Sequence, residues 1–256
     1  MSASQLASNA RRAIPIAAGL AAILASLGLL VYPGAQAESR AILPGLVAVM
    51  IMLAVYGLLG NWGPPRLERR DQRLLRLAMA FGLTAGAIYA VEIVLEYVLL
   101  PSDNTPYGLV EFGLVFLCYL AGGLIAALQT GRARHGLLAA LGAALVWYIV
   151  FLAVTYAFKG TPQQTAVFRA EGNLDDFARS GGTNFEAWLV QDNCGAGFYH
   201  LLLALFVCAF LGGRFNAYSA ALFSQPSSSA PVFSNAGGTT TYSRMGRPGM
   251  GSNRCE

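Results

Sequence analysis

Apolar residues in this chain are grouped into six long stretches that are separated by short polar segments. A helix needs about 20 mostly apolar residues to cross the hydrocarbon core of a bilayer. The stretches that approach or exceed this length are residues 13–32, 41–59, 77–100, 107–128, 136–158 and 198–213. The pattern therefore predicts an all-α fold, a polytopic transmembrane helix bundle with six spans.

The first stretch has a second interpretation. Arg11 and Arg12, an apolar core, a Pro-Gly break and the small residues before Glu38 are together typical of a secretory signal peptide that is cleaved after Ala37. The apolar core of about 19 residues is longer than the roughly 7–15 of most signal peptides. This length favours a retained helix, whereas cleavage would leave five spans and an outer N-terminus.

The positive charges predict the orientation of the spans. Cationic loops resist translocation, so the side with more Lys and Arg stays inside. If the N-terminus is inside, only Arg40, Lys159, Arg169 and Arg179 of the 17 basic residues lie outside. The inner ones are Arg11, Arg12, Arg66, Arg69, Arg70, Arg73, Arg76, Arg132, Arg134, Arg214, Arg244, Arg247 and Arg254. We therefore expect both termini to be cytoplasmic, in a plasma membrane or a bacterial inner membrane.

Composition agrees with this topology and excludes other classes of protein. The chain is 55% hydrophobic and only 12% charged, which is too apolar for an ordinary soluble domain. The net charge of +4 belongs to loops that meet anionic lipid, and no basic stripe interleaved with aromatics predicts nucleic-acid binding. The expected partner is the lipid bilayer, with head-group contacts at Arg66, Arg69, Arg70 and Arg73.

The polar segments divide the chain into three parts. Residues 1–12 are a cytoplasmic N-terminus, residues 13–214 the transmembrane domain, and residues 215–256 a disordered cytoplasmic tail rich in Ser, Gly, Pro, Thr and Asn. Protein partners would bind through this tail, or the whole chain would be a subunit of a membrane complex. The four cysteines are scattered, with Cys194 in an outer loop, and imply no disulfide framework.

The outer loop 159–195 is the only long connection between spans. Thr183 and Glu186 have the spacing of a capping box, which predicts a short amphipathic helix that ends at Asn193 and Gly195. This helix would anchor the loop at the membrane surface. The alternative is a lid over an outward-facing cavity.

Small residues in the third stretch predict close helix packing. Ala78, Gly82, Gly86 and Ala90 recur every four residues and so lie on one ridge of the helix. Such a ridge lets two helix backbones approach closely, and van der Waals contact then holds them together in lipid.

Three glutamates and one histidine are the candidate functional residues. Glu92 and Glu96 share a helix face, and a tight turn places the next span, with Glu111, beside them. His200 lies at a similar depth in the last span. Ionisable groups within the hydrocarbon are costly and often functional, and such a set suits proton relay or cation binding. The alternative is a structural one, in which Glu96 extends to the head groups.

No motif in the chain predicts catalysis. We find no metal-binding spacing, no Gly-rich phosphate loop and no nucleophile–histidine pair within one depth of the membrane, so no catalytic residue, metal or cofactor is expected. The leading hypothesis is a non-enzymatic scaffold or accessory subunit of a membrane complex. The alternative is a small proton- or cation-linked transporter or channel that uses Glu92, Glu96, Glu111 and His200.

Overall fold

The computed structural model of this chain describes residues 3–61, 69–99, 105–170 and 172–223. Within these ranges every regular element is a helix, as the sequence predicted. The helices are α1 (Ala3–Val31), α2 (Pro33–Ala37), α3 (Ser39–Asn61), α4 (Arg69–Leu99), α5 (Thr105–Thr130), α6 (Ala133–Ala157), α7 (Pro162–Ala170), α8 (Asn173–Ser180) and α9 (Phe185–Phe223). Arg66 and residues 224–256 lie outside the described part of the chain.

Five of these helices are long and apolar enough to cross a membrane. Their spanning parts are Ala13–Val31, Arg40–Gly60, Arg73–Leu99, Pro106–Thr130 and Ala133–Ala157. Each matches one of the first five predicted spans within a few residues. The sixth predicted span, residues 198–213, lies within α9, whose side chains are described only as far as Phe206.

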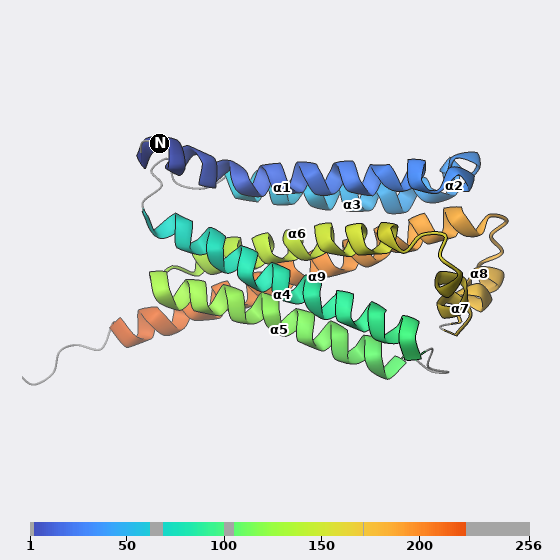
Figure 1. Cartoon of the computed structure of the whole chain (residues 1–256). Helices are drawn as coiled ribbons and strands as arrows, with labels where there is room; N and C mark the ends of the chain where they lie inside the picture. The colour runs from blue at the N-terminus through green and yellow to red at the C-terminus, as the bar shows by residue number, and fades with distance from the viewer. Residues whose placement is uncertain (1–2, 62–68, 100–104, 171, 224–256) are drawn as a thin grey trace, which may run out of the picture.

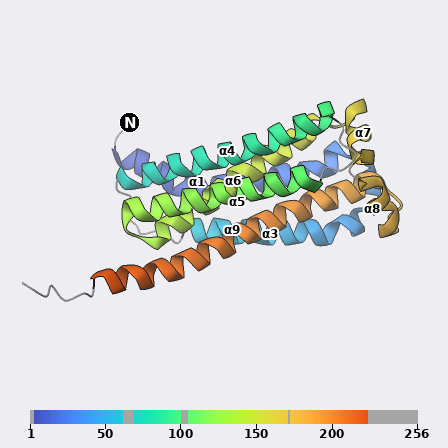
Figure 2. The ribbon, with the colours of Figure 1, turned by 90° about the horizontal axis from the view of Figure 1, so that it is seen from below.

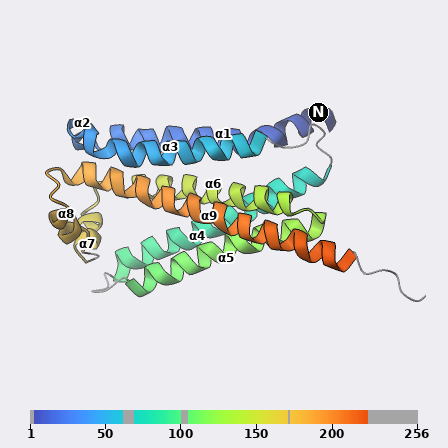
Figure 3. The same ribbon diagram turned by 180° about the vertical axis from the view of Figure 1, so that it is seen from behind.

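The long helices form three pairs that stack on one another (Figure 1). α1 packs beside α3, α6 beside α9, and α4 beside α5, and the pair α6–α9 lies between the other two (Figures 1 and 3). Figure 2 shows the same helices from below. The start of α1 and the end of α9 lie at one end of the bundle, whereas α2, α7 and α8 lie at the opposite end (Figure 1). This second end is called the α7–α8 end below.

α6 is the central helix because its surface is made largely of small residues. It contacts α1, α4, α5 and α9, and 61% of its spanning part is buried, against 22–33% in the other four spans. At Gly136 an added Cβ atom would lie 2.5 Å from the carbonyl oxygen of Gly123 on α5. Only hydrogen at these positions allows the two backbones to come so close.

The small-residue ridge of α4 faces α6. An added Cβ atom at Gly82 would lie 2.6 Å from the Cβ of Val146, and one at Gly86 would lie 2.7 Å from the Cγ1 of Val150. Ala78 is buried against Gly142 of α6, and Ala90 is half-buried. The ridge therefore sets the distance between α4 and α6.

The outer surface of the bundle is covered by large apolar side chains. Ile16, Leu30, Leu58, Val98 and Leu109 are each 63–72% exposed in the isolated chain, and many others are similarly open. A soluble monomer rarely exposes contiguous apolar patches larger than a few hundred Å². A bilayer provides the apolar surroundings that such a surface requires.

The predicted end of the last outer helix is wrong. The helix that begins at Phe185 does not stop at Asn193 and Gly195 but continues as α9 for 39 residues, so that Cys194 is buried in a helix rather than placed in a loop. Gly197 serves packing, because an added Cβ atom there would lie 2.2 Å from the Tyr148 ring of α6.

The prediction of a capping box is also wrong, because Thr183 and Glu186 make other hydrogen bonds. Asn184 is the residue that caps α9, because its Oδ1 accepts a hydrogen bond of 3.1 Å from the N–H of Ala187. Glu186 instead accepts a hydrogen bond from the N–H of Gly34, at 2.6 Å, and Thr183 donates to Glu38. Both acids thereby tie the start of α9 to the turn between α1 and α3.

Two further short helices in the outer segment, α7 and α8, escaped the sequence analysis. Gly160, Gly172 and Gly181 lie at the ends of these helices with φ of 73°, 73° and 70°, a left-handed conformation that favours glycine. α7 and α8 fold across one end of the bundle (Figure 1). They are the elements that cover this end, in place of the amphipathic helix expected from Thr183 onwards.

Candidate functional site

Three glutamates lie together between α4 and α5, toward the α7–α8 end. Glu92 and Glu96 are one turn apart on α4, and Glu111 is on α5; the three carboxylates are close enough to interact electrostatically. Glu96 is 4% exposed and Glu111 is 8% exposed, whereas Glu92 is half-buried. An added Cβ atom at Gly108 would lie 3.8 Å from Glu92 Oε1, so the Glu92 side chain lies across the first turns of α5.

Glu111 is buried with one carboxylate oxygen unpaired. Its side chain interacts with Trp147 of α6, yet among the described residues neither Glu111 Oε1 nor Trp147 Nε1 has a partner with the geometry of a hydrogen bond. Neither Glu92 nor Glu111 forms an ion pair with a described residue. A buried charge without a partner is strongly unfavourable in surroundings of low dielectric constant.

His200 joins the cluster through Trp147. The imidazole stacks on the indole with 3.9 Å between ring centroids and 21° between planes, and Phe112 meets it edge-on at 5.2 Å. Nδ1 of His200 has no hydrogen-bond partner. Trp147 therefore lies between Glu111 and His200, and the structure brings together all four residues that the sequence singled out.

The four residues do not converge on one point. Within the described part of the chain, no group of three or more His, Cys, Asp or Glu side chains is arranged to hold a metal ion. The geometry instead provides neighbouring groups that can accept and release single protons.

Two tyrosines continue the line of polar groups away from Glu111. Tyr119, two turns further along α5, is fully buried and interacts electrostatically with both Glu111 and Tyr56 of α3. Tyr56 donates a hydrogen bond of 2.6 Å to the carbonyl of Leu201 on α9. Neither residue was predicted from the sequence, because a tyrosine within an apolar stretch does not indicate which side chains of other helices it will contact.

A cavity of about 170 Å³ lies at the α7–α8 end, beside the carboxylate cluster. It is enclosed by α4, α6 and α9 and covered by α7 and α8. Its aromatic lining consists of Tyr32, Tyr89, Tyr97, Phe151, Phe158 and Phe168. Its polar lining consists of Thr155, Gln164, Asn173, Asp192 and Asn193. Residues of α7 and α8 line this cavity, and the three glutamates and His200 are not among its described lining residues.

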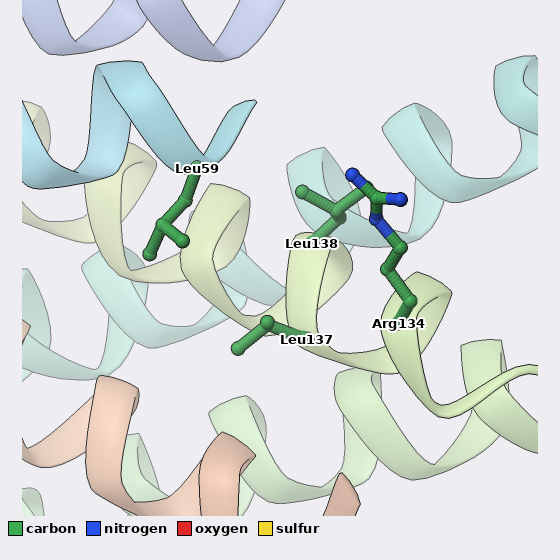
Figure 4. A pocket seen from close by; sticks show the side chains of 4 residues that line it. All are labelled: Leu59, Arg134, Leu137 and Leu138. Atoms are coloured by element: carbon green, nitrogen blue, oxygen red, sulfur yellow. The ribbon is translucent and has the colours of Figure 1, made fainter. Parts of the chain in front are cut away.

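An apolar groove lies at the other end of the bundle, between the end of α3 and the start of α6 (Figure 4). Leu59, Leu137 and Leu138 line it together with Arg134, whose guanidinium group stands at its edge. Of the four arginines expected at lipid head groups, Arg73 is exposed on α4, while the side chains of Arg69 and Arg70 lie outside the described ones. Arg134 is a head-group candidate that sequence analysis had counted only as loop charge.

Comparison with known proteins finds no relative of this chain. No protein-family model matches the chain, and no curated protein or solved structure matches it.

Proposed function

We propose that this chain is a multi-pass membrane protein that relays or transports protons through Glu92, Glu96 and Glu111. The observation that carries the proposal is the burial of Glu96 and Glu111 among apolar helices, with Oε1 of Glu111 left without a partner. A structural role at the head groups would need these carboxylates at the lipid surface.

A proton is the cation that fits this site best. Three neighbouring carboxylates repel one another, and in surroundings of low dielectric constant this repulsion is large. Binding a proton removes one charge without requiring the convergent geometry of a metal site. Protonation and deprotonation of Glu111 would then be linked to Glu92, which is half-buried and lies one turn further from the α7–α8 end than Glu96.

The remaining buried polar groups would define the path of the proton through the bundle. His200 lies beside Trp147 and offers a second group that can change protonation state. Tyr119 and Tyr56 extend from Glu111 toward the opposite end of the bundle. This sequence of buried polar groups along the bundle supports movement across the membrane rather than binding at one surface.

Proteoliposomes with an entrapped pH-sensitive dye test the proposal. An imposed pH gradient should dissipate through the wild-type protein, and Glu92→Gln or Glu111→Gln should slow dissipation by about tenfold or more, as expected for loss of a proton-transfer group. Asp175→Asn, at an exposed position on α8, is the matched control and should leave the rate unchanged. Undiminished flux in both glutamate variants would reject proton movement through this cluster.

A scaffold or accessory subunit is the second candidate function. Its support is the composition of residues 224–256, which are rich in Ser, Gly, Pro, Thr and Asn, and the broad apolar surface of the bundle. Deletion of residues 224–256 should then remove partner proteins that co-purify from native membranes. An unchanged set of partners would reject this role for the tail.

We also propose that both termini are cytoplasmic, in a plasma membrane or a bacterial inner membrane. The support is the bias of basic residues, together with the position of the start of α1 and the end of α9 at one end of the bundle. Reporter fusions after Arg73 and after Glu256 should both report the cytoplasmic side, and a fusion within α8 the opposite side.

A further inference from the structure

The cavity under α7 and α8 has the composition of a ligand site rather than of a packing defect. Six aromatic rings line it, but five polar side chains also face a space of about 170 Å³. Empty cavities in protein interiors are apolar, and one of about 150 Å³ already holds a benzene molecule. A cavity that combines rings with amide, hydroxyl and carboxylate groups is suited to a small polar molecule.

The charge of the lining is negative. Asp192 is the only ionisable carboxyl group among the described lining residues, and it forms no ion pair with a described residue. Its side chain is exposed, yet the surrounding protein partly desolvates its carboxyl group, and this desolvation and Asp176 of α8 both disfavour its charge. Lys159, one of the cations of the outer segment, is paired with Glu186 at 3.9 Å.

The aromatic rings favour the same kind of ligand. A cation within about 6 Å of a ring centroid is attracted by the electrons of the ring face, and cages of such rings recognise quaternary ammonium groups. One lining ring already makes this contact from the protein itself, because Nζ of Lys159 lies 4.4 Å from the centroid of Tyr32. The hydroxyl of Tyr32 is buried near Gln164 without a hydrogen-bond partner among the described residues, and is therefore available to a ligand or a water molecule.

We propose that this cavity binds a small organic ammonium ion, with its charge opposite Asp192 and its methyl or methylene groups against Tyr32, Tyr89, Tyr97 and Phe158. The volume limits the ligand to roughly the size of benzene or slightly larger. An anion is disfavoured by Asp192, and a neutral apolar molecule would leave the charge of Asp192 without a partner in the cavity.

Choline is the probe for this site, and its uncharged carbon isostere, 3,3-dimethylbutan-1-ol, is the matched ligand control. Isothermal titration of the full chain in detergent micelles should give binding of choline at least about tenfold tighter than that of the isostere, a difference of about 1.4 kcal/mol. No heat with choline, or equal affinity for both compounds, would overturn the proposal, since the second result describes an apolar pocket without charge recognition.

Two variants locate the binding. Asp192→Asn should weaken choline binding by about tenfold or more, whereas Asp175→Asn, on the exposed face of α8, should leave it unchanged. Tyr97→Leu tests the aromatic wall and should also weaken binding. Equal affinity of Asp192→Asn and wild type, with both monodisperse on size exclusion, would place the ligand elsewhere. Glu92→Gln should retain choline binding, so failure of the proton proposal and failure of this one are distinguishable.

Discussion

The imidazole of His200 stacks on the indole of Trp147, with ring centroids 3.9 Å apart. This contact joins α9 to α6 at the level where Trp147 also meets Glu111 of α5. One aromatic side chain therefore links the histidine and the carboxylates, which are far apart in the sequence.

Replacing His200 by phenylalanine distinguishes a packing role from a role in proton transfer. His200→Phe keeps a ring between Trp147 and Phe112, so the melting temperature in detergent should change by no more than a few degrees. If His200 relays protons, the same variant should slow dissipation of a pH gradient in proteoliposomes. A flux equal to that of wild type would assign His200 to packing alone.

Gly82→Leu should strongly destabilise the bundle. The larger side chain must occupy space held by Val146 and the backbone of Ala143, where even a Cβ atom would approach to 2.6 Å. Overpacking of this kind costs about 1–3 kcal/mol or more. Thermal unfolding in detergent measures the effect. Gly113→Leu is the control, because an added Cβ atom at Gly113 meets no atom within 4 Å, and it should melt close to the wild-type temperature.

Glu186→Ala should loosen the α7–α8 end. The substitution leaves the N–H of Gly34 without its acceptor and removes the carboxylate that faces Lys159. Loss of a hydrogen-bond acceptor from a partly buried donor costs about 1–3 kcal/mol. Hydrogen exchange at residues 33–37 should accelerate relative to wild type, while exchange in the middle of α6 should not. Equal protection of α2 in both proteins would contradict this assignment.

Asp192 should make stability depend on pH. The residue precedes the predicted sixth span. Desolvation of its carboxyl group by the surrounding protein, followed by the charge of Asp176, raises its pKa above the ordinary value. The folded chain then holds this proton more tightly than the unfolded chain, so the protein gains stability as the pH falls through the raised pKa. Asp192→Asn should melt higher than wild type at neutral pH, with the difference shrinking toward acid. If the difference in melting temperature grew on acidification, the pKa of Asp192 would not be raised in the folded chain.

Arg134→Gln should weaken retention of anionic phospholipid. We expect the groove lined by Leu59, Leu137 and Leu138 to take up an acyl chain, with a lipid phosphate at the Arg134 guanidinium beside it (Figure 4). Native mass spectrometry after delipidation and addition of phosphatidylglycerol should show fewer bound lipids than in wild type. Arg179→Gln, an exposed position on α8, is the control for loss of charge.

The spans could be predicted from the sequence because burial in lipid depends on local composition. The first five predicted spans agree with helices of the structure, and the ridge of Gly82 and Gly86 faces a neighbouring helix as such ridges do. The outer segment was not predictable in the same way. Whether Asn193 and Gly195 end a helix depends on the contact between α9 and Tyr148, which no local pattern encodes.

The site was predictable only in part for the same reason. A tight turn between two spans was enough to place Glu111 beside Glu92 and Glu96. The role of Trp147 between Glu111 and His200, and the participation of Tyr119 and Tyr56, depend on which faces of α3, α5, α6 and α9 meet. The cavity depends on α7 and α8, two short helices whose sequences carry weak signals.

The length of α9 has a mechanical consequence. Its 39 residues extend for about 58 Å, nearly twice the thickness of the hydrocarbon core of about 30 Å. The same uninterrupted rod carries Asp192 at one end, His200 further along, and the last described turns at the far side of the bundle. If α9 tilts as a rigid rod about its cavity end, its opposite end moves through a larger arc. A small displacement of α9 on one side of the bilayer would then produce a larger displacement on the other side.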